Sequence, residues 1–286
     1  MTGSGTVSDP YLVADVYDFC SMNSGYYKLI NDIDFNDHNT YKYGVTSKII
    51  GGNGNAIYLD GDGHEVRNIV CSNGNIKLGF NAGSVSNTNF ANIIINSITD
   101  GYPQIYSRGG FTNCNFGYYL MNSNFRTIFG IDKDYDTQPT RFTNCTFNIA
   151  GKMCSNGSEF ASTFNMCHIN FNKFYVDSGD LFRPVLSGCG FNNSYITGLI
   201  NSSTLTYLFK NDSRDPIVKN SYIAVDNSTI KYVVYTSQST ILSCFIDKTL
   251  MPNIINPPSG VYLLTSEQFK DNDYLNSIGF LAIPIE

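Results

Sequence analysis

Two acidic residues and an arginine, closely spaced, are the groups in this sequence that best fit chemistry on a carbohydrate. Asp177, Asp180 and Arg183 lie within one short polar stretch. A glycoside hydrolase needs two carboxyl groups facing one groove, roughly 5–9.5 Å apart, for acid–base work. An arginine beside them would bind the carboxylate of an acidic sugar. If the chain is an enzyme, we expect Asp177, Asp180 and Arg183 to carry the reaction.

Further acidic residues fall in two other polar segments and fit a simpler explanation. They are Asp132, Asp134 and Asp136 in one segment, and Asp212 and Asp215 around Arg214 in the other. Acids beside Gly, Ser and Asn are typical of solvated bends. The sequence contains no Gly-x-Ser-x-Gly elbow, phosphate-binding loop or dinucleotide fingerprint. We therefore expect a protein that is not an enzyme, with no catalytic residue assigned, and keep glycan cleavage as the alternative.

No metal or cofactor site is expected from the residue pattern. The run Asp60-Gly-Asp-Gly63 lacks the later ligands of a calcium loop, so it predicts a turn. Eight cysteines without a Cys-x-x-Cys pair and three scattered histidines do not match zinc spacing. His64 is expected to hydrogen-bond backbone in that turn. His168 is expected to point outward with no obvious partner.

Composition and charge limit the kinds of partner that the sequence predicts. The chain has 286 residues, a net charge of −6 and only 15% charged residues. Its sequence pI is near 5.0, and an acidic chain does not predict a nucleic-acid partner. No apolar stretch approaches the roughly 18 residues of a membrane-spanning helix, so we expect no membrane insertion. The start MTGSGTVSDP lacks the basic and apolar regions of a secretory signal. If this is the native start, we expect synthesis in a reducing cytosol and cysteines that are reduced, buried thiols.

A short unit recurs along the chain and decides the predicted fold. It reads apolar, any residue, small polar, Cys or Ser or Asn, any residue, apolar, as in 111–116 and 142–147. Alternation with a period of two predicts a strand with one buried face. Taking the fourth position as a marker, the series is Cys114, Cys145, Cys167, Cys189, Ser221 and Cys244.

The spacing of these markers predicts a parallel β-helix. Intervals of 22 or 23 residues are too short for a crossover that contains a helix, which needs about 30 residues. They suit one turn of a solenoid made of short strands. Intervals of 31 or 32 residues imply extra loops, such as 130–139 and 210–216. Because turns stack about 4.8 Å apart, we expect the marker cysteines up to Cys189 to align in one column.

The two ends depart from the repeat, as they must where a solenoid would otherwise expose its core and strand edges. Residues 13–22 predict a short helix over the first turn. Residues 265–270 predict a second short helix with a capping box. We predict one continuous domain, with an N-terminal cap and first strands in 1–50, the β-helix in 51–250 and a C-terminal cap in 251–286.

Both ends resemble a known family. The segments 3–13, 26–34 and 59–69 resemble a module that opens many right-handed β-helices of pectate-lyase-like shape, and 264–280 is similar to their closing segment. Such chains are frequent among phage structural proteins and bacterial surface proteins. The resemblance implies an all-β fold, a single-stranded right-handed parallel β-helix with N- and C-terminal caps. It also implies a homotrimer with its subunits side by side.

These observations favour a non-enzymatic structural protein of a phage virion. We expect a capsid-decorating or tail-appendage β-helix on the exterior of the particle, in contact with other virion proteins and with a host-surface polysaccharide. The alternative is a bacterial cell-surface adhesin, or a polysaccharide lyase or glycoside hydrolase. A third interpretation, a virion protein that is one chain of a larger assembly and binds no ligand, stays open.

Overall fold

The structure of the protein is a computed structural model. It describes residues 1–37, 49–50, 56–72, 77–80, 83–96, 104–107, 109–123, 127–130, 139–153, 158–176, 180–184, 189–209, 217–227, 229–234 and 240–279. The predicted loops 130–139 and 210–216 lie almost entirely outside these residues.

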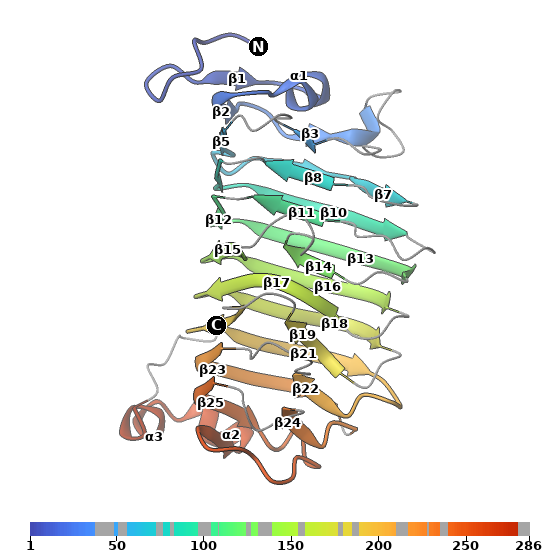
Figure 1. The fold of residues 1–286 in the computed structure, drawn as a ribbon, viewed down its shortest axis with the longest axis vertical. Helices are drawn as coiled ribbons and strands as arrows, with labels where there is room; N and C mark the ends of the chain where they lie inside the picture. The colour runs from blue at the N-terminus through green and yellow to red at the C-terminus, as the bar shows by residue number, and fades with distance from the viewer. Residues whose placement is uncertain are drawn as a thin grey trace.

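Parallel strands stack into a solenoid, which confirms the predicted all-β class (Figure 1). We call its first face the stack β1 (Tyr11–Val13), β2 (Gly25–Leu29), β5 (Ile57–Asp60), β9 (Val85–Ser86), β12 (Phe111–Thr112), β15 (Thr140–Thr143), the second half of β17 (Ser158–Asn165), β20 (Gly190–Asn192), and the first halves of β23 (Ile217–Asp226) and β25 (Thr240–Asp247). Each strand on this face pairs in parallel with the equivalent strand of the next turn, so the strands run across the long axis of the molecule.

Two further faces complete each turn. The second face contains β3 (Ile33–Asp34), β6 (Glu65–Arg67), β10 (Asn89–Asn96), β13 (Asn115–Ser123), β16 (Thr146–Met153), β18 (His168–Val176), β21 (Tyr195–Asn201), the second halves of β23 and β25, and β26 (Val261–Leu264), with β7 (Val70–Ser72) paired to the end of β10. The third face contains β4 (Ile49–Ile50), β8 (Lys77–Phe80), β11 (Gln104–Ser107), β14 (Thr127–Gly130), the first half of β17, β19 (Asp180–Pro184), β22 (Tyr207–Phe209) and β24 (Tyr232–Val234).

Aromatic columns fill the interior between these faces. The first-face column contains Phe111, Phe142, Phe164 and Phe191 in register. Phe142 is stacked on Phe111 and Phe164, with ring centroids 5.2 and 5.3 Å apart. It also meets Phe147 of the second face edge to face, at 83°. Both arrangements are favourable for aromatic rings, and burying each ring contributes roughly 1.5–3 kcal/mol.

A column of small hydrogen-bonding side chains lines the corner between the first and second faces. Cys114, Cys145 and Cys167 stack there, fully buried, as the repeat predicts. Each thiol lies 3.3–3.4 Å from the carbonyl oxygen two residues earlier, for example Thr112 for Cys114. The column continues with Ser194, Ser221 and Cys244. The six cysteines whose side chains the structure describes are buried thiols outside any disulfide, as predicted.

The prediction that Cys189 joins this column is wrong. Phe191 pairs with Phe164 at the start of the repeat unit, which places Ser194 at the marker position. Cys189 lies before β20, at the level of Ser162 in the preceding turn. The segment 186–191 resembles the unit in composition, but its last apolar residue is the first residue of the real unit 191–196.

Asparagines form a second ladder on the outside of the same corner. The corner residue has a positive φ at each level, 54° at Asn113, 52° at Asn144 and 47° at Asn193. Asn tolerates this left-handed conformation better than most residues. Its side chain also bonds the next level: Asn144 Nδ2 donates to Asn113 Oδ1 at 2.8 Å. At one level Met166, with a φ of 53°, takes the place of asparagine and interrupts the ladder.

Short helices accompany the two ends. α1 (Val16–Ser21) lies within the predicted segment 13–22 and buries Phe19 against Phe35 of the 3-10 turn η1 (Phe35–Asp37). α2 (Ser266–Lys270) begins with the predicted capping box, in which Thr265 and Gln268 bond each other's backbone. α3 (Asn272–Ser277) follows directly. No helix in the described part of the chain is long and apolar enough to cross a membrane.

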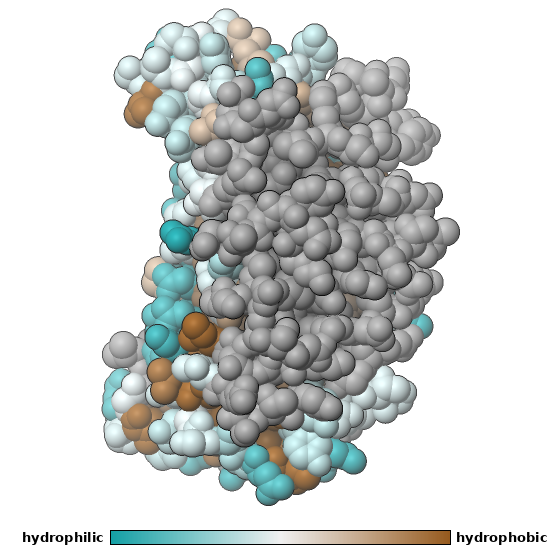
Figure 2. All heavy atoms as spheres, in the orientation of Figure 1, coloured by the Kyte–Doolittle hydropathy of each residue, from teal (hydrophilic) through white to brown (hydrophobic). Residues whose placement is uncertain are grey.

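The C-terminal helices cover the side of the solenoid, and a loop closes its end. Phe269 of α2 and Leu275 of α3 pack on Tyr222 and Phe245, which point out from the second face. Met251 and Ile254, in the loop between β25 and β26, instead join the main core. In Figure 2 the brown hydrophobic residues of the described surface are grouped mainly toward this end.

Candidate functional site

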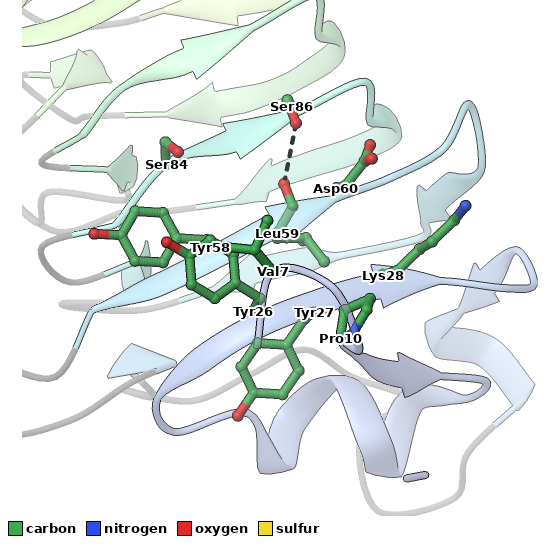
Figure 3. A pocket seen from close by; sticks show the side chains of 10 residues that line it. All are labelled: Val7, Pro10, Tyr26, Tyr27, Lys28, Tyr58, Leu59, Asp60, Ser84 and Ser86. Atoms are coloured by element: carbon green, nitrogen blue, oxygen red, sulfur yellow. Dashed lines mark hydrogen bonds between the residues drawn. The ribbon is translucent and has the colours of Figure 1, made fainter. Parts of the chain in front are cut away.

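The outer surface of the first face is hollowed near its N-terminal end (Figure 3). This hollow, the N-terminal groove, has a volume of about 500 Å³, within the range of small-molecule sites. It is lined by Val7, Pro10, Tyr26, Tyr27, Lys28, Tyr58, Leu59, Asp60, Ser84 and Ser86. Three consecutive strands, β2, β5 and β9, therefore supply most of its wall.

Strand alternation explains which side chains face the groove. Tyr27 and Leu59 are buried in the core, so their neighbours along each strand point outward. The register then places Tyr26 beside Tyr58 and Lys28 beside Asp60. Two outward columns thus run along the groove, one aromatic and one charged.

The aromatic column ends within the groove. The rings of Tyr26 and Tyr58 are stacked, with centroids 4.5 Å apart and an interplanar angle of 13°. Tyr58 is 37% exposed. Ser84 lies on the side of Tyr58 that faces away from Tyr26 (Figure 3). A serine is too small to cover that side, so the groove offers one aromatic ring face to solvent.

The charged column is held in place by hydrogen bonds. Asp60 Oδ1 accepts from the backbone N–H of Asp62 at 3.0 Å and from Asn87 Nδ2 at 2.9 Å. No described residue donates to the other oxygen, Oδ2, which remains available to a ligand. Lys28 Nζ lies 2.9 Å from Asp62 Oδ2, and this hydrogen bond raises the pKa of Lys28.

The N-terminal arm, residues 3–10, closes one end of the groove. The Gly5 carbonyl accepts from the backbone N–H of Tyr26 at 3.0 Å, which joins the arm to β2. Gly25 fits beneath the arm because a Cβ there would lie 2.8 Å from the Gly5 carbonyl oxygen. Asp9 Oδ2 accepts from the backbone N–H of Ser4 at 2.9 Å and so holds the loop of the arm together.

The charged side chains of a polar network on the second face are paired with one another or with asparagine side chains. Arg67 Nε donates to Asp34 Oδ2 at 2.8 Å, and Asn68 Nδ2 donates to Asp34 Oδ1 at 2.7 Å. Burial of Asp34 opposes ionisation, but the hydrogen bonds from Asn68 and Arg67 outweigh it and lower its pKa. Glu65 accepts from Arg67 and from Asn89. The network is thus a cross-strand brace.

The turn predicted at 60–63 is confirmed, and His64 hydrogen-bonds backbone in it as expected. Asp62 and Gly63 both have positive φ, 51° and 85°. The His64 backbone N–H donates to the Gly61 carbonyl oxygen at 2.8 Å, and the His64 ring Nδ1 lies 3.2 Å from Asp32 Oδ1. Asp32 also accepts the backbone N–H of Glu65, which, with the His64 bond, lowers the pKa of Asp32.

His168 has partners, contrary to the sequence-based expectation. Its ring packs on Tyr195 with centroids 4.4 Å apart, and Nε2 lies 2.7 Å from Thr197 Oγ1. Burial lowers its pKa. Both partners come from the next turn, a distance along the chain at which local alternation carries no information.

The predicted catalytic group is only partly covered by the structure. Asp177 lies outside the described residues. Asp180 and Arg183 belong to β19 on the third face, where Asp180 pairs with Tyr207 and Arg183 with Glu159. Their side chains are not among the described ones, so the assignment of Asp177, Asp180 and Arg183 stays a prediction. The acids at 132–136 and 212–215 also lie outside. Within the described residues, no cluster of three or more His, Cys, Asp or Glu could hold a metal ion.

The groove residues were not predicted as a site from the sequence. Tyr26 and Tyr58 drew no attention because each is one aromatic residue among many in an alternating strand. The signal that could have found them is their position: each is the outward residue before a buried one, in consecutive strands. Recognising it requires the register between strands about thirty residues apart.

Comparison with known proteins supports the fold and little beyond it. No model of a known protein family matches the sequence, and no curated protein matches it significantly. Among solved structures, the chain is similar to the crystal structure of a "putative immunoglobulin A1 protease" from Bacteroides ovatus. The match has 18% sequence identity and a TM-score of 0.53, and covers 96% of this chain and 89% of that one. At this identity the likeness concerns the fold alone.

Proposed function

We propose that the protein is a non-enzymatic component of a phage virion, displayed on its exterior, whose N-terminal groove binds a host-surface glycan. The observation that carries the proposal is the exposed ring face of Tyr58, stacked on Tyr26 beside the Asp60 carboxylate. An aromatic face next to fixed hydrogen-bonding groups is the combination that small-ligand sites use to hold and orient a polar ring.

The solenoid suits display outside a cell. Within the described first and second faces, most strands pair with the turn before and the turn after, which leaves few unpaired strand edges. The core is apolar and rich in aromatic rings, and the described thiols are buried without disulfides. Such a rod stays folded without oxidative cross-links. Contacts with other virion proteins, and a side-by-side trimer, are part of the proposal.

Binding is tested with purified capsular polysaccharide from the candidate host. We expect Tyr58→Ala to weaken binding roughly tenfold, about 1.4 kcal/mol, because the stacking surface is lost. The matched control is Tyr119→Ala, which removes a tyrosine outside the groove that is even more exposed, 49% against 37% for Tyr58. Equal binding by the protein and both variants would contradict the assignment of the groove.

Activity and location are tested separately. Incubation with the same polysaccharide should leave its chain length unchanged. Shortened chains would support the glycan-cleaving alternative, and Asp180→Asn would then be the first variant to assay. Mass spectrometry of purified phage particles should detect the protein. Its detection on bacterial envelopes instead would favour the adhesin alternative.

A further inference from the structure

We infer that the groove takes an uncharged hexopyranose ring, stacked on Tyr58 in the place where a third ring of the tyrosine ladder would lie. This inference rests on the proposed function and deepens it by naming the class of sugar. It is carried by the register of β2, β5 and β9 and by the charges beside them.

The first step is the vacant position. The pairing of Leu59 with Val85 puts Ser84 directly after Tyr58 in the outward column. Next comes Gly110, because Val85 pairs with Phe111. The Tyr26–Tyr58 separation of 4.5 Å is close to the strand spacing of about 4.8 Å. Successive rings of the ladder are therefore spaced by about the thickness of one ring. The next two levels carry Ser84 and Gly110, so this column supplies no ring at the position after Tyr58.

The second step is the fit of a pyranose to that place. Aromatic rings carry negative charge on their faces, so they attract the weakly positive C–H groups on one face of a sugar ring. A saturated six-membered ring is about as thick as the gap between stacked rings. Tyr58 lies against Tyr26 on one side only, and no other ring in the described part of the chain contacts it.

The third step is hydrogen bonding at the edge of the sugar. Asp60 Oδ1 is held by Asp62 and Asn87, which fixes the carboxylate and leaves Oδ2 to accept from a hydroxyl. The Ser84 hydroxyl lines the groove at the vacant level and makes no hydrogen bond to a described residue. A ring bearing several hydroxyls satisfies both groups.

The fourth step is charge, which selects against acidic sugars. Asp60 and Asp62 supply two carboxylates, whereas Lys28 supplies one cation that is already paired with Asp62. The next cation along the outward column is Arg141, one level beyond Gly110. That is two levels, or about 10 Å, from the vacant position, near the Debye length at physiological salt. A uronate therefore meets net negative charge in the groove.

Methyl hexopyranosides and the matching methyl uronates are the probes, with affinity measured by titration in NMR. We expect the neutral sugars to bind at least roughly tenfold more tightly than the uronates. Tyr58→Phe should retain binding, whereas Tyr58→Ala should lose it. Ser84→Tyr should also abolish binding, because the new ring extends the tyrosine ladder and occupies the position of the sugar. This variant leaves Tyr58 itself in place. Thr112→Tyr, on an exposed position of the neighbouring outward column, is the control and should bind normally.

The outcomes separate this inference from the proposed function. Equal or tighter binding of uronates overturns the sugar class, while glycan binding itself stands. Unchanged binding in Ser84→Tyr overturns the stacking position. Binding of the polysaccharide without any simple pyranoside overturns the inference and leaves the proposed function in place. If neither polysaccharide nor pyranoside binds, both fail.

Discussion

Two buried serines on the first-face side of the core differ sharply in their hydrogen bonds. Ser194 Oγ lies 2.9 Å from the Asn192 carbonyl oxygen and 3.2 Å from that of Phe164, and accepts from the backbone N–H of Cys167. Ser162 Oγ is equally buried but has no hydrogen-bond partner among the described residues. A satisfied buried hydroxyl stabilises a fold, and an unsatisfied one costs free energy.

Replacing each serine by alanine should therefore have opposite effects. We expect Ser194→Ala to lower the free energy of unfolding by about 1–3 kcal/mol, and Ser162→Ala to leave it unchanged or raise it by up to about 1 kcal/mol. Urea unfolding followed by circular dichroism measures both. A loss in Ser162→Ala as large as that in Ser194→Ala would show that Ser162 finds a partner in solution.

For single residues, the sequence predicts which side chains are buried better than it predicts which residues they contact. Alternation correctly places Cys114, Cys145 and Cys167 inside. It does not reveal that His168 meets Tyr195 and Thr197, because those contacts depend on the register between turns. The groove was missed for the same reason, since Tyr26 and Tyr58 form a site only when their strands are adjacent.

At the scale of the elements, the asparagine ladder at the corner between the first and second faces is interrupted at one level between Asn87 and Asn220. Asn144 donates to Asn113 of the preceding turn, and Asn220 donates to Asn193 of its own preceding turn, both at 2.8 Å. Met166 lies between them with a φ of 53° and is 47% exposed. A methionine there carries the strain of the left-handed conformation and makes no amide bond to either neighbour.

Met166→Asn should stabilise the protein by about 1 kcal/mol, because asparagine tolerates the conformation and links the two halves of the ladder. Met166→Gln is the control: it is polar, but it keeps the strain and lacks the matching length. Thermal unfolding of the three proteins under identical conditions provides the comparison. An equal effect of both substitutions would mean that removing an exposed apolar side chain, and not the ladder, is responsible.

The elements also show why one marker was misplaced. The short unit defines a strand and its inward face, so parallel stacking followed from it correctly. Where the interval between true markers is 27 residues, as between Cys167 and Ser194, two candidate units overlap around Phe191. Composition alone does not choose between them, whereas the stacking of Phe191 on Phe164, 4.9 Å away, does.

On the scale of the whole molecule, the C-terminal helices shield part of the second face. The Phe269 ring lies 4.2 Å from that of Tyr222. Burial, aided by the nearby negative charge of Asp247, raises the pKa of Tyr222 to about 12. In the unfolded chain this phenol ionises near its usual value of 10.0. Its contribution to stability is therefore complete below pH 10 and is lost as the pH rises toward 12.

Phe269→Ala should uncover the phenol and bring the Tyr222 pKa down toward 10.0. Ultraviolet titration of the variant, with and without a second change Tyr222→Phe, isolates the signal of this tyrosine. Phe269→Leu keeps most of the apolar cover and should leave the pKa near its raised value. A Tyr222 pKa that is the same in all three proteins would show that α2 does not shield it.

Phe142 and Phe164 occupy equivalent positions in consecutive turns, so one complete turn can be removed or duplicated without changing the register. Excising residues 143–164 would bring equivalent backbone positions together, and duplicating them would insert a matching layer. The rod can thus become shorter or longer over evolutionary time while the tyrosines at its tip keep their surroundings. If the groove binds a glycan as proposed, the length of the rod and its recognition are separable traits, free to change at different rates in descendants of this chain.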